Sequence, residues 1–338
     1  MNTTWTDYLA QAGAQIDAGH VRFHQHPADD ATVVVPLLHL GLIRSRGVDS
    51  APFLHNLLSN EVNKLAEDAV IHNSFNTPKG RMLASLLMWR EADGHLAALA
   101  ADIQPAILKK LSMYILRSKV ALSDASSELA LIGLSGPQAE AVLEKAGLPR
   151  PAMPMRHHAA DQARVIRLTT TSYILVIPTE QAATHFAALR QAGATAAGTD
   201  AWMLAMIRAG LPLITAATQE LFVAQMLNFE LIGGVSFKKG CYPGQEIVAR
   251  TQYLGKLKKR MYRVHIDSDT APAPADDLYA PQFGEQSAGQ IVNAAPAPGG
   301  GFEALAVLQT SSREAGEVHL GHPEGPRLTF LELPYPLD

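Results

Sequence analysis

Apolar residues recur along the chain at two spacings, one typical of helices and one typical of buried strands. Those between residues 53 and 58 lie one helical turn apart. The nearly continuous apolar run 82–89 favours a buried strand, and turn signals flank it at 76–80 and 92–94. The remaining pattern predicts helices at 5–18, 105–116 and 181–192 and strands at 31–42, 164–168 and 173–177.

Four identities recur at a constant offset of 89 residues, which is 131 minus 42. The matching positions are Leu42-Ile43 with Leu131-Ile132, Gly47 with Gly136, and Leu54 with Leu143. Each set is read as a strand, a glycine turn and the opening of a helix. Four identities arise by chance about as often as not, whereas a duplication would give two similar α/β lobes.

The character of the sequence changes after residue 260. Proline-rich or glycine-rich stretches at 271–275 and 295–301 separate short β-like segments. This pattern predicts a small antiparallel barrel or sandwich at the end of the chain.

Composition narrows the class of protein. The 338 residues carry a net charge of −4, so no basic field favours strong, direct binding to nucleic acid. A single cysteine cannot form an internal disulfide, and no segment approaches the ~20 apolar residues that span a bilayer. The amino-terminal residues lack the pattern of a signal peptide. We expect a cytoplasmic protein that does not bind membranes.

The segment 234–252 carries the most distinctive chemistry. It is predicted to run from a strand through a turn into a helix, with Pro243 in the first helical turn. Cys241 then lies near a helix amino terminus beside Lys238 and Lys239, and both features favour a reactive thiolate. The alternative, about equally weighted, is a small buried hydrophobic side chain. One cysteine supplies neither an iron–sulfur ligand set nor a zinc site, so no resident metal is expected.

At this segment the chain resembles the YgfZ family, which is related to the aminomethyltransferase (T-protein) of the glycine-cleavage system. The family motif Lys-Gly-Cys-aromatic-x-Gly-Gln-Glu is matched by Lys239, Gly240, Cys241, Tyr242, Gly244, Gln245 and Glu246. Weaker matches lie at 57–60, 78–81 and 207–212.

The resemblance implies an α+β fold: two α/β lobes with antiparallel sheets and a carboxy-terminal β-barrel around a central channel. Residues 1–255 would form the folate-binding region, with lobes at roughly 1–50 plus 120–255 and at 51–119. Residues 256–338 would form the barrel. Tetrahydrofolate, or a one-carbon derivative of it, would be the cofactor.

Four further residues are candidate folate contacts. Trp202 matches a family position that touches folate, and an indole also stacks on a flat pterin; an ordinary core position is as well supported. Arg208 and Arg250 suit carboxylates, although a structural ion pair, with Glu220 or Glu246 as partner, is slightly preferred for them. Glu246 either accepts hydrogen bonds from the pterin or interacts favourably with a helix dipole.

Enzyme activity is uncertain. By ungapped placement, the catalytic aspartate of the T-protein falls at Pro105 or Ala106, neither of which can handle a proton, and Asp102 is displaced. The family resemblance therefore favours an accessory protein for iron–sulfur cluster assembly or repair, with iron–sulfur proteins as partners and an indirect effect on tRNA modification. A folate-dependent one-carbon transferase is the second hypothesis, and a direct tRNA-binding module is the third.

Overall fold

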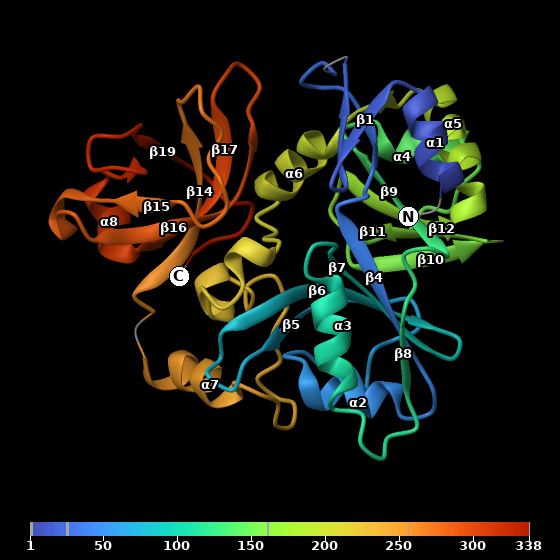
Figure 1. Cartoon of the computed structure of the whole chain (residues 1–338), viewed down its shortest axis with the longest axis horizontal. Coiled ribbons are helices and arrows are strands. Elements are labelled where there is room, and N and C mark those ends of the chain that lie inside the picture. Colours follow the sequence, from blue (N-terminus) through green and yellow to red (C-terminus); the bar gives the residue numbers. More distant parts are fainter. Residues whose placement is uncertain (1–2, 25–26, 161, 256, 338) are drawn as a thin grey trace. The chain divides into compact units, whose positions relative to one another are not determined.

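The computed structural model describes residues 3–24, 27–160, 162–255 and 257–337 (Figure 1). The chain divides into two compact units, each built from several segments. The first comprises Met1–Phe53, Asn63–Ile71 and Leu87–Ala205, and the second Leu54–Val62, His72–Leu86 and Met206–Asp338.

The helices and strands are as follows. Helices are α1 (Thr3–Gln11), α2 (Ser50–Leu57), α3 (Gln104–Ser112), α4 (Ala139–Lys145), α5 (Ala182–Gln191), α6 (Thr199–Arg208), α7 (Gln245–Leu254) and α8 (Thr310–Ala315). The first strands are β1 (Ala14–Asp17), β2 (His20–Phe23), β3 (Val33–Pro36), β4 (Leu40–Arg46), β5 (Val70–Asn76), β6 (Met82–Glu91), β7 (Gly94–Ala100), β8 (Ala121–Asp124) and β9 (Leu129–Ser135). The others are β10 (Arg156–Ala160), β11 (Ala163–Arg167), β12 (Ser172–Pro178), β13 (Thr195–Ala196), β14 (Lys259–Ile266), β15 (Asp277–Tyr279), β16 (Ser287–Pro296), β17 (Phe302–Gln309), β18 (His319–Leu320) and β19 (Leu328–Leu331).

Two sheets share the order of their first four strands and differ in the strands beyond β4 and β9. The first runs β5-β6-β7-β4-β8, and the second runs β10-β11-β12-β9-β3 with the short β13 added in parallel. Along β12 the side chains of Tyr173, Leu175 and Ile177 point to one face, where they pack with apolar residues of α1, α4 and α5. The predicted α/β lobes with antiparallel sheets are confirmed.

The repeat at an offset of 89 residues is a structural one. Gly47 follows β4 with a φ of 120°, and Gly136 follows β9 with a φ of 137°. The first helical hydrogen bonds also match: Phe53 N donates to Asp49 O, and Val142 N donates to Gln138 O, both at 2.9 Å. The two copies therefore share the strand, glycine turn and helix opening that the duplication reading predicts.

The carboxy-terminal sheet has the order β18-β15-β16-β17-β14-β19 and curls into a half-barrel. It belongs entirely to the second unit, and its core includes Val264, Ile291, Ala306 and Leu308. These strands appear in orange to red in Figure 1. The predicted antiparallel β-domain is confirmed, with β15 and β18 as strands that the sequence pattern missed.

Two elements predicted within the first unit are wrong. The helix expected at 5–18 ends at Gln11, because Gly13 (φ 90°) turns the chain into β1. The strand expected at 31–42 is two strands, since the chain turns after Pro36 and β3 and β4 join different sheets. Among the described residues no helix is long and apolar enough to cross a membrane.

Candidate functional site

Two side chains just after α2 form hydrogen bonds with the segment that leads to the cysteine motif. Ser59 Oγ donates to Gly234 O at 2.6 Å, and Asn60 Nδ2 donates to Gly233 O at 2.6 Å. Ser236 N then donates to Ser59 O at 3.0 Å. These bonds make residues 234–236 a tethered loop, so the strand predicted at this point is wrong.

The turn between β5 and β6 packs against the start of α7. Gly80 and Gly244 have positive φ values of 74° and 83°. A Cβ atom on Gly244 would lie 2.6 Å from Thr77 O and 2.7 Å from Gly80 Cα. Only glycine fits so close a backbone approach, so two of the segments matched in the sequence, 78–81 and 239–246, meet here.

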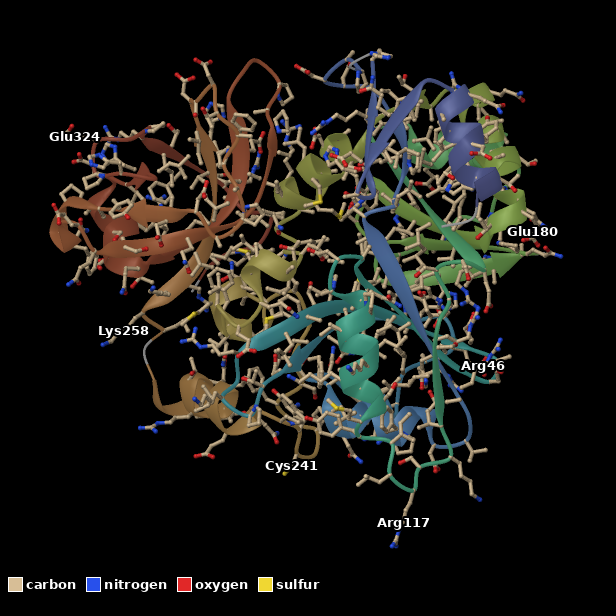
Figure 2. All side chains as sticks on the ribbon, in the orientation of Figure 1. Arg46, Arg117, Glu180, Cys241, Lys258 and Glu324 are labelled. Carbon is tan, nitrogen blue, oxygen red and sulfur yellow. The ribbon has the colours of Figure 1, made fainter. Side chains whose placement is uncertain are left out.

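Cys241 is an exposed thiol. Figure 2 shows its side chain projecting away from the ribbon. Helix α7 begins at Gln245 with Gly244 as its N-cap, so Pro243 precedes the helix, and its predicted place in the first turn is wrong. Cys241 itself lies in the loop before α7, and the reading of it as a buried hydrophobic residue does not fit.

Lys239 points inward. Its side chain is 8% exposed, and Nζ donates to the carbonyl oxygens of His55, Leu58 and Asn60. The ammonium group also lies 4.9 Å from the centroid of the Tyr242 ring. Burial lowers the pKa of Lys239 to about 8, while the charge of Glu61 opposes the change.

Arg208 forms a structural ion pair. Its Nη2 lies 2.7 Å from Glu303 Oε1, and Arg263 Nη2 lies 2.7 Å from Glu303 Oε2. Burial alone would raise the pKa of Glu303, but hydrogen bonds from the two arginines lower it. The expected kind of interaction is present, whereas the expected partners, Glu220 or Glu246, are replaced by Glu303.

Trp202 lies in α6 within the first unit, and its side chain is 2% exposed. A Cβ atom on Gly133 would lie 2.5 Å from Trp202 Cε3, so the indole packs closely against the backbone of β9. The glycine at 133 is what leaves room for the indole.

Glu246 and Arg250 are exposed on α7, four residues apart and therefore on one face of the helix. No group of three or more metal-ligating side chains is found in the part of the chain that the structure describes.

A family model places the chain. The model of the GCVT N-terminal domain matches residues 15–232, which is more than half of the chain. The chain belongs to the GCVT family. The match ends before Lys239, so the cysteine motif follows the GCVT domain along the chain.

Two comparisons extend along nearly the whole GCVT-family chain. It is 28% identical over 319 residues to "tRNA-modifying protein YgfZ" of Enterobacter sp. (strain 638), covering 93% of this chain and 97% of that protein. The crystal structure of glycine cleavage system aminomethyltransferase T from Bartonella henselae matches with a TM-score of 0.80 at 17% identity. That match covers 99% of this chain and 97% of the other, and shows a shared fold.

Sequence reasoning missed the supports of the motif in this GCVT-family chain. The sequence marks Ser59 and Asn60 only as part of a family match. The acceptors of Lys239 are backbone carbonyl groups, which residue identity does not predict. The spacing predicts that Lys239 acts on Cys241 through its charge, whereas its ammonium group binds backbone carbonyl groups instead. The available signal was Gly234, whose Cβ would lie 2.4 Å from the Phe229 ring and which therefore marks a close approach.

Proposed function

We propose that the chain is a tetrahydrofolate-binding accessory protein for iron–sulfur cluster assembly or repair, with Cys241 as its reactive thiol. It affects tRNA modification indirectly, through an iron–sulfur enzyme. The observation that carries the proposal is the exposure of the only cysteine, within the family motif, in a chain similar to a YgfZ protein over 97% of that protein's length.

The position of Cys241 supports a role in transient chemistry. An exposed sulfur flanked by Gly240 is open to a second macromolecule, because a Cβ at Gly240 would have no neighbour closer than 4.0 Å. One thiolate can serve as a temporary ligand, a sulfur carrier or a redox partner, whereas it cannot hold a resident cluster.

Part of the expected folate set fits such a ligand. The exposed Glu246 carboxylate can accept pterin N–H groups, and the exposed Arg250 guanidinium can bind a carboxylate through two hydrogen bonds. Arg208 would first have to leave Glu303, and Trp202 offers little free surface for stacking. When bound, tetrahydrofolate would supply the carriage of a one-carbon unit.

The test replaces Cys241 with alanine in cells that depend on this protein. We expect the activities of iron–sulfur enzymes and the amount of thiomethylated nucleosides in tRNA to fall together. Lys109→Ala, a change at an exposed residue outside the motif, is the control and should leave both unchanged. Full enzyme activity with Cys241→Ala would rule out the thiol's role.

Turnover separates this proposal from a one-carbon transferase. The purified protein is incubated with 5,10-methylene-tetrahydrofolate and candidate amines, and the folates are then analysed. Binding of folate without turnover supports the accessory role, whereas product formation favours the transferase.

A further inference from the structure

The ammonium group of Lys239 binds the carboxyl end of α2 and the residues just after it: His55 lies in the last turn of the helix, and Leu58 and Asn60 follow it. The last carbonyl groups of a helix have no partners within the helix, and a cation at this end is favoured by the helix dipole. The ammonium group has three N–H donors, and three carbonyl oxygens, those of His55, Leu58 and Asn60, accept them. The hydrogen-bonding capacity of the side chain is therefore used in full.

The same lysine is the main attachment of the loop that carries Cys241. Among the described residues, the backbone of 237–241 makes no hydrogen bond, in contrast to Ser236 before it and Tyr242 after it. A further contact of this stretch is the edge-on packing of Phe237 on Tyr253, with centroids 6.1 Å apart. Gly240 beside the cysteine adds no side chain that could hold the loop.

We infer that Lys239 is the positioning residue of the cysteine loop (residues 237–241): its ammonium group fixes this loop on the carboxyl end of α2, so that Cys241 projects from a defined backbone. The inference rests on the proposed function, because positioning of the sulfur matters only if Cys241 is the reactive thiol. The anchoring of the loop can be measured separately. Lys239 acts here through the backbone and not as a charge directed at the sulfur.

Protonation of Lys239 adds a second property. With a pKa lowered to about 8 by burial, the amine loses charge and one donor just above neutral pH. The titratable groups that face it are Glu61, His55, whose Nδ1 lies 3.0 Å from Glu61 Oε1, and Tyr242. Burial raises the pKa of Tyr242 to about 12, so this phenol keeps its proton in the same range. The loop should therefore loosen as the pH rises through about 8.

Spin labelling tests the inference, because the chain has only one cysteine. A nitroxide on Cys241 is measured by electron paramagnetic resonance in the wild type and in Lys239→Met, Lys239→Arg and Lys238→Met. We expect the rotational correlation time of the label to fall about twofold in Lys239→Met, as a held loop gains nanosecond motion. In Lys239→Arg the rotational correlation time should fall by less than in Lys239→Met, since a planar guanidinium cannot direct three donors at converging carbonyls. Lys238→Met should match the wild type.

A pH series covers the case in which Lys239→Met does not fold. In the wild type the label should become more mobile between pH 7 and 9, and in Lys239→Arg it should not. Equal mobility in all folded variants together with a flat wild-type series would overturn the inference. Cellular assays of Cys241→Ala are scored separately, so a positioned loop without an iron–sulfur phenotype would refute the proposed function alone.

Discussion

Helices α2 and α4 occupy equivalent places in the two copies of the repeat, yet their carboxyl ends are closed in different ways. Helix α4 closes itself: Gly147 has a φ of 68°, and Leu148 N donates to Leu143 O at 2.9 Å. The position equivalent to Gly147 is Leu58, which instead bridges to Phe75 of β5. The carbonyl oxygen of His55 in α2, and those of Leu58 and Asn60 just after the helix, then accept hydrogen bonds from Lys239, about 180 residues further along the chain.

The difference shows how the end of a helix in one copy of the repeat also comes to hold a distant loop. A glycine closes a helix end locally and connects it to nothing else. At the carboxyl end of α2 a remote lysine, Lys239, binds the carbonyl groups and attaches the loop of Cys241 to them. The copy without the glycine is the one that supports Cys241.

The polar interior of the first copy gives a second contrast. Ser50 Oγ lies 2.8 Å from both Ser45 Oγ and His95 Nδ1 in the buried interior. The equivalent positions of the second copy hold Leu134, Ala139 and Tyr173, which belong to an apolar core. The same backbone therefore tolerates either a hydrogen-bonded or an apolar filling.

The largest expected effect concerns the two turn glycines. A Cβ at Gly47 would lie 2.2 Å from Lys119 O, and one at Gly136 would lie 2.5 Å from Thr32 Cα. Gly47→Ala and Gly136→Ala should each lower the free energy of unfolding by about 3 kcal/mol, from strain and overlap together. Urea denaturation measures the change in the free energy of unfolding. Gly193→Ala, with positive φ but open space, is the control and should cost about 1 kcal/mol. Clearly unequal losses at 47 and 136 would break the equivalence.

The next effect tests the end of α2. Lys239→Met removes the donors of three carbonyl groups and should lower the free energy of unfolding by about 2 kcal/mol. Lys238→Met, at the exposed neighbour, should change it by less than about 0.5 kcal/mol. Matching denaturation curves for the two variants would show that α2 closes without the lysine.

A smaller loss is expected at the end of α4. Gly147→Ala should cost about 1 kcal/mol, because alanine adopts the left-handed conformation poorly although nothing lies within 4 Å of the added Cβ. Differential scanning calorimetry measures the shift. The cysteine-loop label should not respond to this variant, and a response would mean that the two helix ends are not independent.

The smallest effect concerns pH and His95. Burial, helped by the charge of Arg90, lowers the pKa of His95 to about 4. The unfolded chain binds a proton more readily than the folded one between pH 6.5 and 4, so stability is lost as the pH falls through this range. At pH 6 the loss in the free energy of unfolding that is due to His95 is on the order of 0.5 kcal/mol. His95→Phe should reduce the difference between the unfolding free energies at pH 7.5 and pH 6 relative to the wild type. An unchanged difference in His95→Phe would remove His95 from the acid response.

Local pattern was sufficient for much of the fold. The apolar run 82–89 and the short carboxy-terminal segments predicted β6 and the antiparallel β-domain, because each depends on neighbours in sequence. The turn glycines indicated the repeat without deciding it. It failed at 31–42, where two strands enter different sheets, since sheet membership depends on distant partners. Within the site, the motif predicted the importance of Cys241 but not the direction in which Lys239 points.

The sequence by itself determined the strand-rich carboxyl region and the single thiol in its motif, because spacing and residue type carry this information. Only the tertiary structure decided which groups Lys239, Arg208 and Trp202 contact. Their partners are backbone carbonyls, Glu303 and the bare backbone at Gly133, all far away along the chain. A side chain's partner is fixed by the folding that brings distant segments together, and no local spacing records it.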